Sequence, residues 1–182
     1  MNTDFVAKKK EIADRMLSRG ESGLYFLEEF LHDKQGGTDP VFSRSLYILL
    51  SYNFELILKS LLVLNSGALS IEGLEKELIG YLHNFQKISE KLTQNRLSYI
   101  GIKNIARTQQ KAFIEYVVET NDGAKILVQD FKNVRYDFMS DDLRNIDCHE
   151  VSRIKQEIKS LLVIVKQIRV GYSVTKGTGY LL

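Results

Sequence analysis

The sequence has few of the residues that interrupt or cross-link a chain. Its 182 residues include one proline, one cysteine, three histidines and no tryptophan. The scarcity of proline favours long helices, because proline removes a backbone donor and breaks a helix interior. Cys148 is the only cysteine, which excludes an internal disulfide and a multi-cysteine metal site. His32, His83 and His149 lie far apart in the sequence and not at metal-ligand spacing, so we expect neither a bound metal nor a cofactor.

The motifs of several common enzyme classes are also missing. The chain has no phosphate-binding glycine loop before a Lys and Ser/Thr, no dinucleotide fingerprint and no nucleophile elbow. ATPases, zinc proteases and α/β-hydrolases are therefore poor candidates. The net charge of +2 does not require a nucleic-acid partner, so binding of an anion would depend on a local cluster of cations. The N-terminal residues contain no apolar signal core, and we expect a cytoplasmic protein.

Length and composition predict one globular domain over residues 1–182. The hydrophobic fraction of 44% and the charged fraction of 26% are ordinary for such a domain. Periodicity predicts a predominantly all-α fold, an up-and-down bundle of about five helices, with a small β-hairpin near residues 114–130. The tail, residues 171–182, is polar and contains glycine until its last residues, and we expect it to be mobile or to dock Tyr180–Leu182 on a neighbour.

The most apolar stretch of the chain runs from Val41 to Asn65. Leucine, isoleucine and phenylalanine nearly surround it when it is drawn as a helix. Pro40 suits its first position, Asp39 can cap it, and Gly67 lies where a left-handed residue would end it. We therefore predict a core helix around which the rest of the chain packs.

A narrow polar stripe interrupts this apolar surface. It consists of Arg44, Ser51, Glu55 and Lys59. A membrane span is a poor interpretation, because Glu55 and Lys59 lie near the middle of the run and a charge at the bilayer centre costs about 3 kcal/mol. The two residues are spaced for an i, i+4 ion pair. Either this is a surface pair worth about 0.3–0.5 kcal/mol, or the stripe faces a cleft or a partner and helps to bind a substrate.

Other helices follow from the same periodicity. We predict an amphipathic helix over residues 4–19, a break at Gly20 and Gly23, and a second helix over residues 23–33. A periodic run over residues 70–92 indicates one long helix or two, with a break at His83-Asn84, where Asn84 would cap the second.

The second half of the chain is less regular. Residues 106–113 are weakly helical in pattern, whereas IEYVVET over residues 114–120 is rich in β-branched and aromatic residues. Asn121-Asp122-Gly123 and KILVQDF follow, and together these segments predict a hairpin. A last amphipathic helix is predicted to begin near residues 147–150 and to stop at Gly171.

The segment before this last helix carries a candidate for RNA chemistry. It reads Arg144-Asn145-Ile146-Asp147-Cys148-His149. An arginine keeps its charge and suits a phosphate, while a histidine can take or give a proton near neutral pH. Together they fit RNA cleavage, in which a base activates the ribose 2′-hydroxyl and a cation stabilises the phosphate oxygens without a metal. Alternatively, Arg144 and His149 form an ordinary surface pair at a helix N-terminus.

Several segments resemble the HEPN superfamily of α-helical domains from bacterial defence, toxin-antitoxin and nucleotidyltransferase-associated systems. They are Glu55–Lys59 in the apolar helix, His83–Ile88, Val134–Tyr136 and the closing helix, so the resemblance spans roughly residues 40 to 170. It implies an up-and-down helical bundle that is frequently a homodimer, an antitoxin or nucleotidyltransferase partner and, in the active branches, a metal-independent endoribonuclease.

The resemblance also assigns roles to residues. The superfamily signature is an arginine, a polar residue and then a histidine at the start of a late helix, which Arg144, Asn145 and His149 match with four residues between Arg144 and His149. His149 would be the base or acid, Arg144 the phosphate clamp and Asn145 an orienting residue, and two such motifs would meet across a dimer axis.

The pair Arg135-Tyr136, in contrast, is typical of branches in which the ribonuclease signature is not always present, and there Arg135 would anchor a different, substrate-binding pocket. The alternatives are therefore a non-catalytic HEPN-like module that binds a nucleotide or a protein, and an unrelated helical interaction protein.

Overall fold

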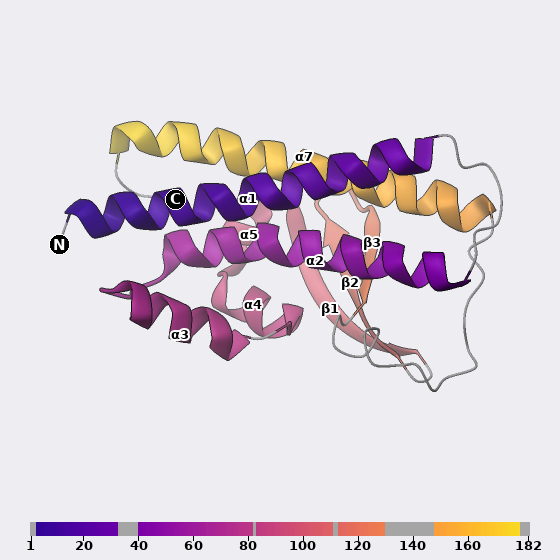
Figure 1. The fold of residues 1–182 in the computed structure, drawn as a ribbon, viewed down its shortest axis with the longest axis horizontal. Helices are drawn as coiled ribbons and strands as arrows, with labels where there is room; N and C mark the ends of the chain where they lie inside the picture. Colours follow the sequence, from indigo (N-terminus) through magenta and orange to yellow (C-terminus); the bar gives the residue numbers. More distant parts are fainter. Residues whose placement is uncertain (1–2, 33–39, 82, 111–112, 130–147, 179–182) are drawn as a thin grey trace.

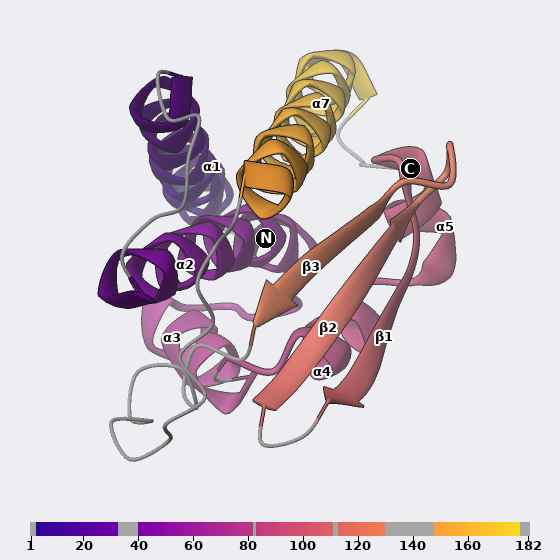
Figure 2. The same ribbon diagram turned by 90° about the vertical axis from the view of Figure 1, so that its right-hand side faces the viewer.

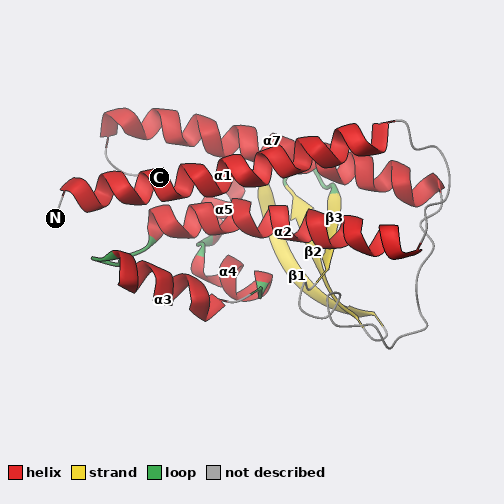
Figure 3. Ribbon diagram, viewed as in Figure 1, coloured by secondary structure: helices red, strands yellow, loops and turns green. Residues whose placement is uncertain are grey.

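The computed structural model describes residues 3–32, 40–81, 83–110, 113–129 and 148–178 (Figure 1). The helices are α1 (Thr3–His32), α2 (Pro40–Asn65), α3 (Ile71–Tyr81), α4 (Phe85–Lys91), α5 (Gln94–Tyr99) and α7 (Cys148–Thr178). The strands are β1 (Ile102–Gln110), β2 (Phe113–Thr120) and β3 (Lys125–Gln129). The predicted fold class, mostly helical with a small β-hairpin, is confirmed (Figure 3).

The fold has a layer of three long helices, α1, α2 and α7, and a small sheet that packs against this layer (Figure 2). Helices α1 and α2 run antiparallel, and α7 lies beside α1 in the direction opposite to it (Figure 1). The sheet lies on the side of α2 and α7 that faces away from α1 (Figure 2), and β3 contacts both of these helices. Arg169 ties α7 to α1, because its Nε donates a hydrogen bond to Glu21 Oε2 at 2.9 Å.

Helix α1 is continuous through Gly20 and Gly23, so the predicted break there is wrong. Its buried positions recur at alternating steps of four and three: Ala13, Leu17, Gly20, Leu24, Leu27 and Leu31. The facing positions of α2 follow the same spacing: Leu46, Leu50, Asn53, Ile57 and Ser60. This is the seam of an antiparallel helix pair. The two glycines let the helices approach closely, since a Cβ on Gly20 would lie 2.9 Å from the backbone oxygen of Asn53.

Helix α2 has the predicted bounds, from Pro40 to Asn65. Its stretch Ser45–Asn65 is long and apolar enough to cross a membrane, but 72% of the tested window is buried inside the protein, as in an interior helix. Gly67 does not adopt the predicted left-handed conformation, which among the described glycines occurs at Gly101 and Gly123. Ser66 organises this end of the helix instead, because its hydroxyl accepts from the backbone N–H of Ala68 at 3.0 Å.

The break between α3 and α4 lies where it was predicted. The side chain of Asn84 accepts a hydrogen bond from the backbone N–H of Lys87 at 3.0 Å, and this caps α4. Phe85 and Ile88 then turn into the core. The cap therefore fixes the start of α4 and, directly before it, the position of His83.

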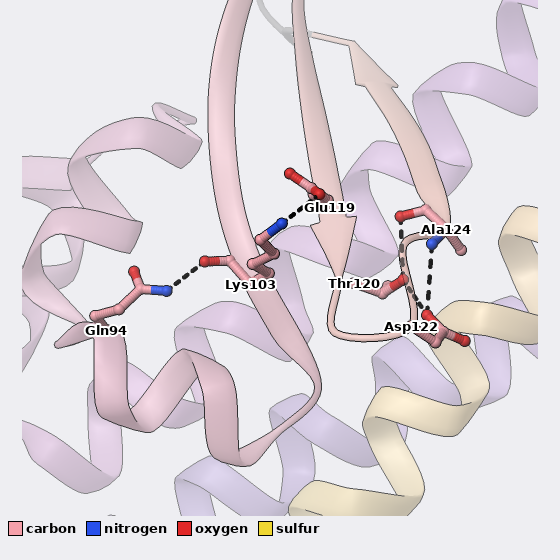
Figure 4. A network of polar contacts seen from close by, with 6 residues as sticks. All are labelled: Gln94, Lys103, Glu119, Thr120, Asp122 and Ala124. Carbon is pink, nitrogen blue, oxygen red and sulfur yellow. Dashed lines mark hydrogen bonds and ion pairs between the residues drawn. The ribbon is translucent and has the colours of Figure 1, made fainter.

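The predicted hairpin is present as β2 and β3, with Val118 opposite Ile126. The weakly helical prediction for residues 106–113 is wrong, because residues 102–110 form β1, which pairs with β2 along its length. In the β2–β3 turn, Asp122 accepts from the Thr120 hydroxyl, and this bond is the main reason why the pKa of that carboxyl lies below its ordinary value (Figure 4).

Helix α7 starts at Cys148, within the predicted range, but it continues past Gly171 to Thr178. The predicted stop at Gly171 is therefore wrong, and residues 171–178 are helical, whereas residues 179–182 lie outside the described residues. A glycine inside a helix costs only about 1 kcal/mol relative to alanine, which packing overrides. Gly171 is buried. Upstream, Val151, Ile154, Ile158, Leu161 and Val165 place the helix against the core.

Candidate functional site

The polar stripe of α2 contains a buried carboxylate that contacts one ammonium group and one imidazole. Glu55 is 5% exposed. Its Oε1 lies 2.7 Å from Lys59 Nζ, and its Oε2 lies 2.6 Å from His83 Nδ1. The predicted i, i+4 pair is thus confirmed, but the interpretation as a surface pair is wrong, because the carboxylate is inside the protein. We call Glu55, Lys59 and His83 the α2 polar cluster.

The α2 polar cluster opens towards solvent through its imidazole and ammonium groups. The side chain of Lys59 is 15% exposed and that of His83 is 36% exposed. Glu55 and Lys59 are held on one side of α2 by their spacing of four residues. His83 comes from the turn before α4, where the Asn84 cap fixes the backbone. A carboxylate that orients an imidazole is suited to holding a proton donor or acceptor at the protein surface.

A Glu55→Gln substitution is expected to lower the free energy of unfolding by about 1–2 kcal/mol, because it removes the charge that compensates Lys59 and the carboxylate oxygen that contacts His83. The loss stays below that of a fully buried pair, since the side chains of Lys59 and His83 both reach water. Urea denaturation monitored by circular dichroism measures it. Glu11→Gln is the matched control, because Glu11 also contacts two basic side chains, Lys8 and Arg15, but at the surface. Equal losses in the two variants would contradict the role assigned to Glu55.

A second polar network joins α7 to the sheet and to α2. Glu157 is 2% exposed, and its Oε1 accepts from the backbone N–H of Leu127 at 3.2 Å and lies 3.4 Å from Arg153 Nε. Arg153 Nη2 donates to the hydroxyl of Tyr47 at 2.8 Å. These residues were not predicted as part of a site, although the i, i+4 spacing of Arg153 and Glu157 was a signal. The network anchors the N-terminal half of α7.

Of the three residues predicted for RNA cleavage, the structure places one, His149, at this same end of α7. His149 is the second residue of the helix, and its side chain lies outside what the structure describes. Arg144 and Asn145 lie outside the described residues, as do Arg135 and Tyr136. The predicted placement of His149 at the start of a late helix is confirmed, because α7 begins at Cys148.

A hollow of ≈ 600 Å³ lies between α1 and α7. Its lining residues are Tyr25, Glu28, Glu29, His32, Lys155 and Lys159. Lys155 Nζ donates to the backbone oxygen of His32 at 3.2 Å, which ties α7 to the end of α1. Lys155 follows His149 by six residues, about 9 Å along a helix. The hollow carries both acids and lysines, so its walls alone do not select an anion. Within the described part of the chain, no group of three His, Cys, Asp or Glu residues is placed to hold a metal.

Comparison of the chain with protein-family models, with curated proteins and with solved structures finds no match. The candidate site therefore rests on two features of this structure alone. One is the α2 polar cluster of Glu55, Lys59 and His83, and the other is the start of α7, which carries His149.

Proposed function

We propose that this chain is a HEPN-like cytoplasmic protein that acts as a metal-independent endoribonuclease of a toxin-antitoxin or defence system. The observation that carries the proposal is the position of His149 in the first turn of α7. The first turn of a helix has backbone N–H groups without helical partners and the positive end of the helix dipole, both of which favour a bound phosphate.

A contact within the fold supports the same resemblance. The segments Glu55–Lys59 and His83–Ile88 are two of those that resemble the HEPN superfamily, and they lie far apart in the sequence. In the structure, His83 Nδ1 is 2.6 Å from Glu55 Oε2, so the two segments meet through the residues that begin them. The mostly helical fold agrees with this resemblance.

The proposed reaction needs one base, one acid and one cation. His149 takes the proton from the ribose 2′-hydroxyl, whose oxygen attacks the adjacent phosphorus and forms a 2′,3′-cyclic phosphate. The bond from phosphorus to the 5′-oxygen breaks, and that oxygen leaves with a proton donated by an acid. Arg144 balances the charge on the phosphate oxygens, and Asn145 orients Arg144 or the RNA.

The test is cleavage of a labelled RNA by the purified full-length chain in the presence of EDTA. We expect products with 2′,3′-cyclic phosphate ends, and a loss of about 100-fold or more in His149→Ala and Arg144→Ala, because each removes a group required in the transition state. His32→Ala and Arg107→Ala are matched controls, since both side chains are exposed, on α1 and β1, and lie outside the proposed chemistry. RNA that stays intact, or equal losses in the controls, would contradict the proposal.

A second candidate is a non-catalytic HEPN-like module that binds a nucleotide or a protein, such as an antitoxin or a nucleotidyltransferase. The observation that favours protein binding is the set of large apolar side chains exposed on α1 and α2, including Phe26, Leu49 and Tyr52. Such a module would leave RNA intact in the same assay. Its His149→Ala variant would keep the melting temperature and the binding properties of the wild type.

A further inference from the structure

A polar hollow of ≈ 280 Å³ lies between α7 and the turn that joins β2 to β3. Its α7 wall includes Gln156, Lys159 and Gln167, and its opposite wall includes Gly101, Asn121 and Asp122. We call it the α7–turn hollow. A water takes up about 30 Å³, so the hollow has room for roughly nine non-hydrogen atoms, about the size of one nucleobase. Small ligands bind in hollows of this kind, where a few polar groups converge.

The wall opposite α7 is held by hydrogen bonds of the β2–β3 turn. The backbone N–H of Asn121 donates to the backbone oxygen of Gly101 at 2.8 Å, which joins this turn to the start of β1. Asp122 Oδ1 accepts from the hydroxyl of Thr120 and from the backbone N–H of Ala124 at 3.5 Å (Figure 4). Because both bonds go to Oδ1, the second carboxylate oxygen, Oδ2, can accept donors from a ligand.

Gln167 of α7 meets the opposite wall at Gly101. The backbone of Gly101 has a φ of +86°, and an added Cβ would lie 2.5 Å from Gln167 Oε1. Both the backbone conformation and the close contact therefore require glycine at this position. The contact holds the carboxamide of Gln167 between the two walls, where it can donate and accept hydrogen bonds.

The exposed side of α7 at this hollow is cationic. Residues 151–170 contain one acid and five cations, which are Arg153, Lys155, Lys159, Lys166 and Arg169. The acid, Glu157, is 2% exposed and pairs with Arg153, while Arg169 pairs with acids of α1. Lys159 and Lys166 are exposed and lie about two turns apart on one side of the helix. Lys159 lines both this hollow and the one beside α1, so it lies on the ridge between them. Such a surface attracts a polyanion, for example a chain of phosphates.

The polar groups of the α7–turn hollow match one nucleobase better than the others. A carboxylate such as Asp122 only accepts hydrogen bonds, and an ammonium such as Lys159 only donates them. Guanine presents two neighbouring N–H donors, at N1 and N2, and two neighbouring acceptors, O6 and N7. A carboxylate can take the two donors together, and lysine is a common partner of O6 and N7. Adenine, cytosine and uracil each lack the pair of neighbouring donors.

The hollow lies on the same side of α7 as the proposed catalytic position. Gln156 and Ser160, which both line the hollow, follow His149 by about two and three helical turns, so the three positions share one face of the helix. Gln156 is thus about 10 Å from position 149 along the helix axis. A single RNA strand with a phosphate at the first turn of α7 can therefore reach the hollow within a few nucleotides.

We propose that the α7–turn hollow binds a guanine base of a single-stranded RNA. Asp122 accepts from N1–H and N2–H, and Lys159 donates to O6 and N7. Val163, which lines the hollow and is 52% exposed, provides an apolar surface for the face of the base. The inference rests on the proposed function, because it takes RNA as the ligand, and it gives the ribonuclease a sequence preference near the cleaved bond.

The test is the affinity of the full-length chain for labelled hexanucleotides with 2′-O-methyl groups, measured by fluorescence anisotropy at one fixed salt concentration. These strands lack the 2′-hydroxyl nucleophile, so binding is measured whether or not the chain cleaves RNA. We expect (GU)3 to bind about tenfold more tightly than U6. Inosine keeps N1–H, O6 and N7 but lacks the 2-amino group, so (IU)3 is expected to bind about threefold more weakly than (GU)3.

Two variants separate the roles of the two walls. Asp122→Asn replaces one acceptor oxygen by a donor, and we expect the preference for (GU)3 over U6 to fall from about tenfold to within about twofold. Asparagine Oδ1 can still accept from Thr120, so the turn keeps that bond. Lys159→Gln is expected to weaken the binding of (GU)3 about fivefold. Glu75→Gln and Lys76→Gln are matched controls, because both side chains are exposed on α3 and neither lines the hollow. Far-UV circular dichroism checks that each variant is folded.

The outcomes distinguish this site from the ribonuclease. Equal binding of (GU)3 and U6 by the wild type, or a guanine preference that survives in Asp122→Asn, would overturn the guanine site even if the chain cleaves RNA. A guanine preference that Asp122→Asn removes would support the site even if every RNA stays intact, in which case the ribonuclease fails alone. GMP that binds as tightly as (GU)3 would overturn the assignment to an RNA strand and make a free nucleotide the ligand.

Discussion

A Gly20→Leu variant is expected to lose about 3 kcal/mol of unfolding free energy and about 10 °C in melting temperature. Two effects oppose each other at this position. Replacing a helical glycine gains up to about 1 kcal/mol from helix propensity. Against this, the Cβ alone would lie 2.9 Å from the backbone oxygen of Asn53 and 2.9 Å from Ile57 Cγ1. A backbone oxygen in the middle of α2 cannot turn aside, so α1 and α2 must separate and the overpacking term dominates.

The matched control is a helical glycine that faces open space. Gly80, near the end of α3, has no neighbouring atom within 4 Å of an added Cβ. Gly80→Ala is therefore expected to stabilise the protein by about 0.5 kcal/mol, because only the propensity term acts there. Guanidinium denaturation of both variants measures the difference. If Gly20→Leu were neutral, the close approach of α1 and α2 at Gly20 would be excluded.

Local sequence signals predicted those elements whose ends are set by local chemistry. The bounds of α2 follow from Pro40 and from the length of the apolar run, and the start of α4 follows from the Asn84 cap. The glycines were misleading, because their effect depends on what packs against them. Gly20 was predicted to break α1, and Gly171 to end α7, yet each lies inside a helix and is buried.

The sheet also shows that local signals miss structure that depends on contacts between distant segments. The hairpin of β2 and β3 was predicted from β-branched residues around Asn121-Asp122-Gly123, whereas β1 was not. The stretch Ile102–Gln110 is mostly polar and has little intrinsic preference for a strand. It becomes a strand because β2 offers it a complete edge to pair with, from Ile102 opposite Thr120 to Gln110 opposite Phe113. Pairing between distant segments overrides local preference.

The candidate site was predicted in part. The spacing of Glu55 and Lys59 indicated their ion pair, but His83 joins it from 28 residues away, and no local pattern encodes such a contact. The burial of Glu55 depends equally on what packs over α2. The sequence also predicted that a late helix begins near His149, and α7 does begin at Cys148. The chemistry proposed for Arg144 and His149 stays a prediction.

A Phe85→Ala substitution is expected to lower the free energy of unfolding by about 4 kcal/mol, because it creates a cavity where the helices meet the sheet. The ring of Phe85 is fully buried and lies 5.4 Å from that of Phe54 in α2 and 5.2 Å from that of Tyr116 in β2, the latter edge to face. Both partners are themselves buried, so neither can turn to fill the space without losing its own contacts. Aromatic pairs add about 0.5–1.5 kcal/mol each beyond the area that they bury.

Because Phe85 follows Asn84 in the first turn of α4, the same substitution is expected to loosen the turn that holds His83 against Glu55. The measurements are guanidinium denaturation for the global loss and amide hydrogen exchange of α4 for the local one. Phe85→Leu keeps most of the volume and is expected to lose only about 1.5 kcal/mol. Ile79→Ala, at an exposed position of α3, should stay within about 0.5 kcal/mol of the wild type. If Phe85→Ala lost no more free energy of unfolding than Ile79→Ala, Phe85 would not anchor α4 in the core. The α2 polar cluster would then have to be held by contacts other than those of Phe85.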